Sequence, residues 1–146
     1  MLEEVQDIVY RDAAKAGHAA PNPQPAPTGG LWHHEVHADS ILLFRFSALT
    51  FNSRRIHYDR LYATDIEHYP ALVVHGPPVA MLLLDSLGRE CPGRSLRNFS
   101  FRAVRPLFDD SPFKVCGRLE DDGHAVRLWA QDAVGSLAVG ASAELT

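Results

Sequence analysis

The stretch "ALVVHGPPVAMLLLDSLGREC", residues 71–91, decides the fold because it predicts an apolar strand end, a sharp break and then a long helix. The His-Gly-Pro-Pro break suits a helix start, since prolines are tolerated in the first helical turn. Four apolar side chains then follow helical spacing: Val79, Leu82, Leu83 and Leu87. Pro92 and Gly93 end the helix. The apolar face is so broad that we expect the helix to be buried.

Four strand candidates follow this helix, each with the alternation or the β-branched and aromatic content of a strand. They are residues 95–108, 111–122, 124–134 and 136–145. In the first of them, alternation places Phe99, Phe101 and Ala103 on one face. Arg102 then lies on the other face. The letters DDGH at 121–124 predict a hairpin between the second and third candidates.

The chain before residue 71 divides into shorter predicted elements. Residues 38–49, "ADSILLFRFSAL", are predicted to form a strand from their β-branched, aromatic and leucine content. Residues 52–66 predict a loop leading into a short helical turn that Asp59 can cap. Residues 17–30 hold four prolines and three glycines, so they predict a linker or an extended wrapping arm. Residues 1–16 fit either a short strand or a frayed helix.

One long buried helix beside a run of antiparallel strands is an α+β architecture. The arrangement that we predict is a hot-dog fold, in which a curled antiparallel sheet wraps around one central helix. The hot-dog domain would comprise residues 31–146, preceded by an N-terminal segment and Pro/Gly-rich linker at residues 1–30. Such a sheet has an exposed edge, which pairing with a second copy normally covers.

The composition argues against several classes of partner. The net charge is −4 and the 14 basic residues are scattered apart from Arg54–Arg55, which argues against nucleic-acid binding. Cys91 and Cys116 form no CxxC motif, so neither a zinc site nor a disulfide framework is predicted, and a reduced cytoplasmic setting is expected. Three histidines lie close together, but no residues at suitable spacing complete a metal site: His33, His34 and His37. The longest apolar run is too short to cross a bilayer, so no membrane partner is expected.

One polar string, "FSALTFNSRRIHYDRLYA" at residues 46–63, indicates a functional site. It combines hydroxyls, an amide, arginines, a histidine and aspartate with aromatic residues between them. A core strand cannot bury such groups without partners, and an ordinary surface loop does not need them. Taken alone, His57 fits a loop histidine bonded to backbone and Asn52 fits a turn residue. Their combination favours a site.

Three motifs resemble those of the hot-dog acyl-thioester hydratases and dehydratases, which include the MaoC-like (R)-specific enoyl-CoA hydratases and the type 2 3-hydroxyacyl-thioester dehydratases. They are "FSALTFNSRRIHYD" (46–59), "YPALVVHGPPVAMLLL" (69–84) and "FSFRAVRPLF" (99–108). The resemblance covers most of the chain and is strongest for the branch with mesaconyl-C4-CoA and itaconyl-CoA hydratases. The usual hydratase string is Gly-Asp-x-Asn-Pro-x-His. Here His57 keeps the histidine, Asn52 replaces the aspartate and Arg54–Arg55 replace Asn-Pro, as in that branch.

The resemblance implies a hydro-lyase that adds water to, or removes it from, a small acyl-CoA, and it assigns roles to eight residues. His57 would transfer protons, because its ordinary pKa lies near neutrality, and Asn52 would orient the water or the imidazole. The N–H of Gly76 would bind the thioester oxygen at a helix start. The remaining residues would bind the substrate or shape its pocket. Arg54 or Arg55 would bind a free carboxylate, and Arg105, with Arg102, would bind the CoA phosphates. His75 would form part of the pocket wall. No cofactor is expected beyond the CoA of the substrate.

The same resemblance leaves the partner and the exact function open. Relatives in this branch are often double hot-dogs, and residues 4–14 resemble the segment that joins the two halves. The chain would then pair with itself or with a separate second half. Alternatives are a 3-hydroxyacyl-carrier-protein dehydratase, a thioesterase or a non-catalytic hot-dog subunit. A thioesterase would need a carboxylate near the helix start, and a non-catalytic half would be expected to have lost His57.

Overall fold

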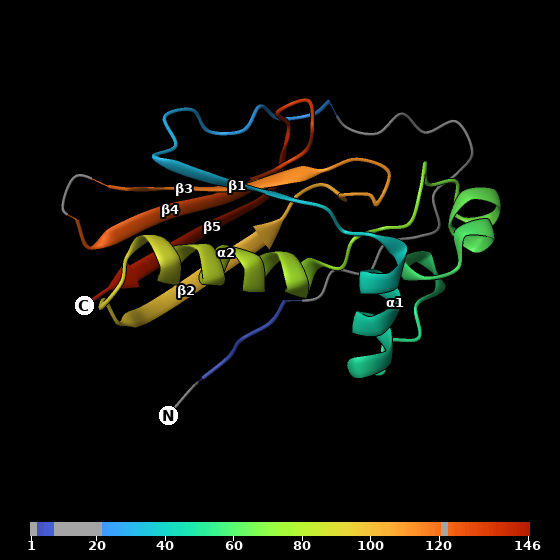
Figure 1. Cartoon of the computed structure of the whole chain (residues 1–146), viewed down its shortest axis with the longest axis horizontal. Coiled ribbons are helices and arrows are strands. Elements are labelled where there is room, and N and C mark those ends of the chain that lie inside the picture. The colour runs from blue at the N-terminus through green and yellow to red at the C-terminus, as the bar shows by residue number, and fades with distance from the viewer. Residues whose placement is uncertain (1–2, 8–21, 121–122) are drawn as a thin grey trace.

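A five-stranded antiparallel sheet forms the centre of the computed structural model, which describes residues 3–7, 22–120 and 123–146. Figure 1 shows the strands and the helix that lies across them. In their order across the sheet, the strands are β1 (Trp32–Val36), β3 (Phe113–Leu119), β4 (Ala125–Gln131), β5 (Leu137–Leu145) and β2 (Leu96–Ala103). Every neighbouring pair is antiparallel. The predicted α+β class is therefore confirmed.

The long helix α2 (Gly76–Glu90) confirms the element predicted from residues 71–91. It packs on β3, β4 and β5, where Val79, Leu83 and Leu87 are buried. The expected burial of the helix is met on the side that faces the sheet but not on the opposite side, where Met81 is 61% exposed. The sheet covers one side of the helix, and the described part of the chain leaves the Met81 side open. The apolar residues before the helix form a single bridge, Val73–Phe108, in place of a full strand.

The strand predicted at residues 38–49 is wrong, because Ser40–Leu49 form a helix, α1. Its N-terminus is capped by the Asp39 side chain, which accepts a hydrogen bond from the Leu42 N–H at 2.7 Å. Only Ile41 is β-branched here, and leucine and alanine favour a helix once a cap is present. Helix α1 stands beside the start of α2 and away from the sheet (Figure 1).

The segment after α1 matches its prediction of a loop with a short helical turn. Two short helices follow in it, η1 (Arg55–His57) and η2 (Tyr62–Ile66). The side chain of Asp59 accepts a hydrogen bond from the Tyr62 N–H at 3.0 Å, as expected for a local cap. The polar string 46–63 thus runs from the second half of α1 through η1 to the first residues of η2.

All four strands predicted after α2 are confirmed, and they are β2, β3, β4 and β5. The hairpin between β3 and β4 is present, with Gly123 at φ 69°, although residues 121–122 of its predicted turn lie outside the described residues. The Phe99 and Phe101 rings stack with centroids 5.9 Å apart, in agreement with the predicted shared face. Phe99 packs against the core, whereas Phe101 is 43% exposed and Ala103 is also exposed. The reason is that β2 lies at the edge of the sheet, where β5 is its single neighbouring strand in the described part of the chain.

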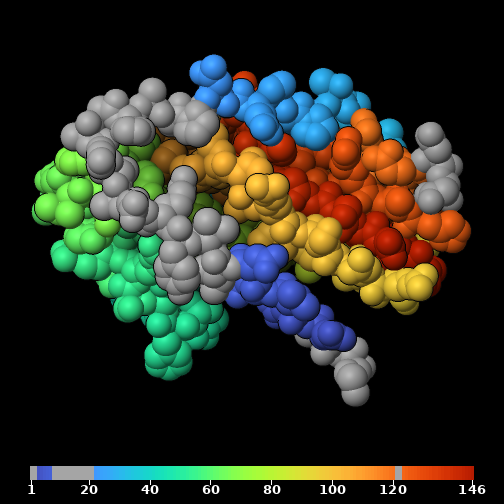
Figure 2. Space-filling model, turned by 180° about the vertical axis from the view of Figure 1, so that it is seen from behind, coloured from blue at the N-terminus to red at the C-terminus, as the bar shows by residue number. Residues whose placement is uncertain are grey.

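Strand β1 was missed by the sequence analysis, which placed only the start of the fold near Leu31. In β1, Trp32 stands opposite Gly117 of β3, and a Cβ at Gly117 would overlap the Trp32 indole. Residues 22–30 form an extended arm, in which Pro25 bridges Ser136. Figure 2 shows this arm along one edge of the molecule. Residues 3–7 form no regular element, and the rest of the 1–16 prediction lies outside the described residues.

Apolar side chains of α2 and of the strands pack together in one hydrophobic core. Its largest buried members include Phe113, Leu43, Leu83 and Leu128, whereas Trp129 is buried beside Gly30 of the arm. Within the described ranges, no helix is long and apolar enough to cross a membrane. The division into residues 1–30 and 31–146 stays a prediction.

Candidate active site

His57 lies at the end of η1, and its ring is held by a backbone carbonyl. It is 8% exposed, and its Nδ1 lies 2.7 Å from the carbonyl oxygen of Val73. A carbonyl oxygen can only accept, so Nδ1 carries the proton. The lone pair of the neutral ring is therefore on Nε2, which is the nitrogen that can act as a base.

The Val73 carbonyl is itself fixed, because the extended segment before α2 is pinned on both sides. The Val73 N–H donates to the Ile56 carbonyl at 3.0 Å, and the Val74 N–H donates to the Leu107 carbonyl at 2.8 Å. The Leu72 N–H donates to the carboxylate of Asp109 at 2.9 Å. The acceptor for His57 is therefore part of the rigid frame of the fold.

Burial keeps His57 neutral near pH 7. The loss of solvent lowers the pKa of His57 below its usual 6.5, and the nearby positive charge of Arg54 lowers it further. The hydrogen bond to Val73 works in the opposite direction. A neutral ring with a lone pair on Nε2 is the form that a general base requires.

His75 lies directly behind His57. The two imidazole rings are stacked, with centroids 3.7 Å apart and planes 18° apart. The Nε2 of His75 is hydrogen bonded to the Ser47 hydroxyl at 2.8 Å, and the His75 ring is 1% exposed. Burial, with a smaller effect of His57, lowers the pKa of His75 to about 4. His75 is therefore also neutral at pH 7.

Gly76 begins α2 immediately after His75, so the stack places His57 next to the helix start. Pro77 and Pro78 follow it and have no N–H groups. In the described part of the chain, the Gly76 N–H has no hydrogen-bond acceptor. It carries the partial positive charge of the helix N-terminus, and no atom lies within 4 Å of where a Cβ would be. A carbonyl oxygen can approach this N–H closely.

Asn52 enters this group through a sharp turn after α1. Phe51 has φ 53°, in the left-handed region, and the Asn52 N–H then donates to the Ser47 carbonyl at 2.9 Å. The Asn52 Oδ1 accepts a hydrogen bond from the Arg54 N–H at 3.0 Å. Because the oxygen is engaged, the Nδ2 amino group is the end that remains to donate to a water or substrate.

The two arginines differ in their contacts. The Arg55 guanidinium binds the Asp59 carboxylate, with Nη2 2.6 Å from Oδ2, and lies over the Tyr62 ring at 4.3 Å. This pairing lowers the pKa of Asp59, which therefore stays ionised. Within the described residues, the Arg54 side chain has no such partner, although its charge acts on His57. Of these two guanidinium groups, only that of Arg55 is engaged by a carboxylate in the described chain.

Arg105 is not brought into this group by any contact that the structure shows. Its Nε lies 3.9 Å from an Asp132 carboxylate oxygen, and Arg102 is an exposed residue of the edge strand β2. Ser47 is the residue that the sequence analysis missed. It stands 28 positions before His75, in a segment predicted as a strand, so no spacing in the sequence could have paired them.

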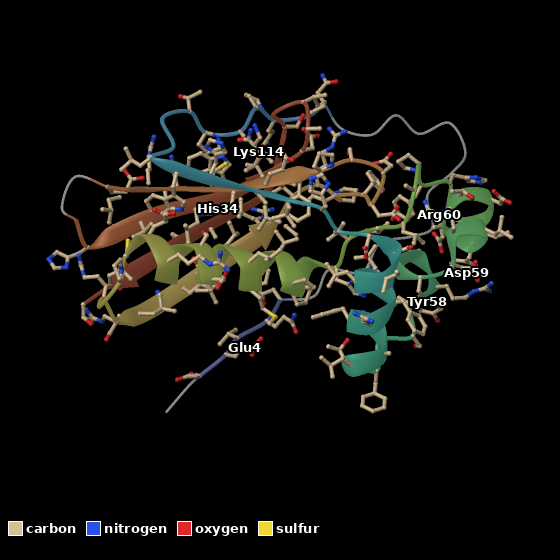
Figure 3. All side chains as sticks on the ribbon, viewed as in Figure 1. Glu4, His34, Tyr58, Asp59, Arg60 and Lys114 are labelled. Carbon is tan, nitrogen blue, oxygen red and sulfur yellow. The ribbon has the colours of Figure 1, made fainter. Side chains whose placement is uncertain are left out.

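The histidine cluster near β1 lies apart from this group. His34 bonds to Glu90 and His37 bonds to Glu35, each at 3.0 Å. Figure 3 shows His34 between β1 and α2, whereas Tyr58, Asp59 and Arg60 lie at the end of the molecule with α1. A cavity of about 310 Å³ adjoins His34 and His37. Among residues 3–7, 22–120 and 123–146, no three metal-binding side chains come together.

Comparison with known sequences identifies a family and a relative. Residues 1–109 match the family described as hydroxyacyl-thioester dehydratase type 2. Mesaconyl-C(4)-CoA hydratase of Chloroflexus aurantiacus (strain ATCC 29366 / DSM 635 / J-10-fl) is 48% identical over 149 aligned positions. The alignment covers 99% of this chain and 50% of that protein, so the chain spans half the length of this relative.

Comparison with solved structures finds the same architecture at lower identity. The (R)-hydratase from A. caviae involved in PHA biosynthesis has a TM-score of 0.65 and 21% identity, covering 87% of this chain and 98% of its own. A chain of the ChsH1-ChsH2 complex from Mycobacterium tuberculosis has a TM-score of 0.65 and 15% identity, covering 81% of this chain and 94% of its own. These likenesses confirm the predicted hot-dog fold.

Proposed function

Because the chain belongs to the hydroxyacyl-thioester dehydratase type 2 family, we propose that it is a hydro-lyase acting on an acyl-CoA thioester. The reaction adds water across an α,β-unsaturated acyl-CoA, or removes it from the 3-hydroxy form. One observation carries this proposal. His57 is buried and neutral, its Nε2 has no hydrogen-bond partner among the described residues, and its ring stacks on His75, the residue before the helix start at Gly76.

In this proposal His57 transfers the protons. Its Nε2 takes a proton from water as the oxygen bonds to the β-carbon, and the imidazolium returns that proton to the α-carbon. Net, one water is added across the double bond and the ring ends neutral. Asn52 has no proton to exchange at pH 7, so its amide orients the attacking water. Asp59 is engaged by Arg55 and takes no part.

Gly76 stabilises the charge that develops on the thioester oxygen. As water adds, electron density moves onto this oxygen, and a preorganised N–H at a helix N-terminus binds it more strongly than in the ground state. Pro77 and Pro78 cannot share this task, so the Gly76 N–H is the donor that the first helical turn offers. The space beside Gly76 lets the thioester reach it.

The proposed substrate is a small branched dicarboxylic acyl-CoA, such as mesaconyl-C4-CoA or itaconyl-CoA. The 48% identical relative is named as a mesaconyl-C(4)-CoA hydratase, which supports this class. Such a substrate has a free carboxylate, and a guanidinium binds carboxylates well. Arg54 is the better candidate because Arg55 is occupied by Asp59 and Tyr62. His75 forms the wall behind His57, and Arg105 is retained as a candidate for the CoA phosphates.

The proposed partner is a second hot-dog half, as a second copy or a separate chain. The chain spans half the length of its relative, which leaves room for another domain of this size. The edge strand β2 is open to pairing. Apolar side chains are exposed around α1 and the following turn: Ile41, Phe44, Leu49, Phe51, Leu61 and Ile66. A surface of this kind favours association.

The proposal needs no cofactor besides the substrate's CoA, and the free cysteines Cys91 and Cys116 suit a reducing cytoplasm.

The test is a hydration assay on the purified chain with mesaconyl-C4-CoA, itaconyl-CoA and crotonyl-CoA, each followed by loss of the enoyl-thioester absorbance. His57→Ala is the control. We expect the wild-type chain to hydrate a carboxylated substrate and His57→Ala to be inactive on it. Turnover of crotonyl-CoA alone would support the hydro-lyase function and rule out a dicarboxylic acyl-CoA as the substrate. If none reacts, alone or with a second half, and a 3-hydroxyacyl-carrier protein is dehydrated, the carrier-protein alternative is correct. If that substrate is also inert, a non-catalytic subunit is indicated.

A further inference from the structure

Three buried polar side chains form a row that ends at His57, the residue proposed to transfer protons. Ser47 is 4% exposed, His75 is 1% exposed and His57 is 8% exposed. The Ser47 hydroxyl holds His75 Nε2 at 2.8 Å, and the His75 ring lies nearly flat against the His57 ring. The Phe46 ring closes another side of His75, with centroids 4.9 Å apart. The position of the His75 ring is thus fixed by its neighbours.

A helix cap does not explain why a histidine stands here. His75 is the N-cap residue of α2, but Pro77 and Pro78 occupy the next positions that would normally donate an N–H to a capping side chain. The His75 side chain makes no capping hydrogen bond, and its Nδ1 is buried without a partner among the residues that the structure describes. An unpaired buried nitrogen is destabilising, so an aromatic hydrocarbon would serve a purely structural purpose better.

We propose that His75 is a positioning residue for His57, and that Ser47 fixes the His75 ring so that His57 keeps its Nδ1–H on Val73 and presents Nε2 to the reacting water. This inference rests on the proposed hydro-lyase function and adds two residues to it. Val73 alone fixes one point of the imidazole, and rotation about that hydrogen bond would move Nε2. A flat ring 3.7 Å behind His57 removes that freedom. A displacement of about 1 Å at a reacting group costs up to roughly a hundredfold in rate.

The stack also suits the charge that His57 acquires during the reaction. When Nε2 takes a proton, the imidazolium lies over the face of a neutral aromatic ring, which is a favourable arrangement for a cation. His75 is neutral because burial lowers its pKa to about 4. Arg54 is the charged group of the surrounding loop that acts on His57, and it opposes the imidazolium. From α1, the uncharged side chains of Phe46 and Ser47 face His75.

The test compares Ser47→Ala with Ser47→Thr, which keeps the hydroxyl. Ser86→Ala is the matched control, because Ser86 is also a buried helical serine, bonded to the Leu83 carbonyl at 2.9 Å further along α2. The readouts are kcat and KM for the hydrated enoyl-CoA, and the ¹⁵N chemical shifts of His57, which report the protonated ring nitrogen. In Ser47→Ala we expect kcat to fall about tenfold, the value of one neutral hydrogen bond.

In that variant KM should stay within about twofold, because substrate binding is not the step that changes. The His57 shifts should move from a single Nδ1–H form toward a mixture, and Ser47→Thr should restore both readouts. An unchanged kcat and unchanged shifts in a folded Ser47→Ala protein would overturn the inference. The NMR spectrum of the wild type is a second test that needs no variant. A His57 with its proton on Nε2 would also overturn the inference, whereas an inactive wild type with the expected shifts would count against the hydro-lyase proposal alone.

Discussion

The Nδ1 atom of His57 lies 2.7 Å from the carbonyl oxygen of Val73, and this contact joins the polar string 46–63 to the segment that enters α2. It makes Nε2 the basic nitrogen of His57. Because His75 and Gly76 follow Val73 by two and three positions, one short segment supplies the ring behind His57 and the N–H beside it. The predictions below depend on this arrangement.

The pH dependence of hydration should report a His57 with a lowered pKa. Burial lowers the pKa of His57 below 6.5, and the base is active only in its neutral form. Activity should therefore stay constant as pH falls through 6.5 and decline only at lower pH. The measurement is kcat/KM against pH, which follows groups of the free enzyme. An inflection at or above the ordinary histidine pKa would contradict the burial of a neutral His57.

Stability should fall in mild acid because His75 resists protonation. The pKa of His75 is about 4 in the folded chain and about 6.5 for an ordinary histidine, so below 6.5 the unfolded chain takes up a proton that the folded chain does not. Stability is thus unaffected above that value and is lost as pH falls toward 4. Between about pH 7 and about pH 5 this amounts to roughly 2 kcal/mol.

Urea unfolding at the two pH values measures this loss, and His75→Phe is the control that lacks the titrating ring. The difference between wild type and variant isolates His75 from the carboxylates, which titrate in both. An equal loss in the two proteins would show that His75 does not resist protonation.

Arg54 should determine the preference for a carboxylated substrate. Arg54→Ala should raise KM for mesaconyl-C4-CoA about ten- to a hundredfold, the range for a hydrogen bond to a charged group, and leave crotonyl-CoA unchanged. Arg55→Ala is the matched variant and should act mainly on stability, because it releases Asp59 and Tyr62. The measurements are steady-state kinetics with both substrates and thermal melting. If only Arg55→Ala removes the preference, the roles of the two arginines are reversed.

Gly76→Ala should separate activity from stability. A Cβ at Gly76 meets no atom within 4 Å, so the fold accommodates it. The new methyl group would nevertheless occupy the space through which the thioester oxygen approaches the Gly76 N–H. We expect a folded protein with a melting temperature at or above that of the wild type and a reduced kcat. Gly88→Ala in the same helix also meets no atom within 4 Å and should keep full activity. Equal activity in both variants would remove Gly76 from the site.

Asp109 should support the site through Leu72. Its side chain is 3% exposed, accepts from the Leu72 N–H at 2.9 Å, and pairs with Arg60, whose Nη1 lies 3.2 Å away. Asp109→Ala leaves the Leu72 N–H unpaired next to Val73, so unfolding should become easier by about 1–3 kcal/mol. Asp109→Asn keeps an acceptor and should lose less. Chemical denaturation of both variants checks this order, and equal losses would assign the effect to the Arg60 ion pair.

Much of the fold followed from local pattern. Helix α2 was predicted because its apolar spacing and its proline start agree, and the four strands after it were predicted because alternation and turn residues agree. The strand prediction for residues 38–49 was wrong because leucine, phenylalanine and alanine are compatible with a helix as well as with a strand. The N-cap at Asp39 favours a helix, and the segment is not one of the five strands of the sheet. Strand β1 was missed because its pairing with β3 depends on residues about 80 positions away, such as Trp32 opposite Gly117.

The sequence by itself determined which residue types the candidate site contains, because the string around His57 and the helix start at Gly76 are local and chemically distinctive. The tertiary structure decided how they act together. It stacked His57 on His75, brought Ser47 to His75 across 28 positions, and occupied Arg55 while leaving Arg54 free of side-chain partners in the described chain. The physical reason is that a ring stack, a buried hydrogen bond and an ion pair depend on distances between side chains. Those distances are set only when the elements pack.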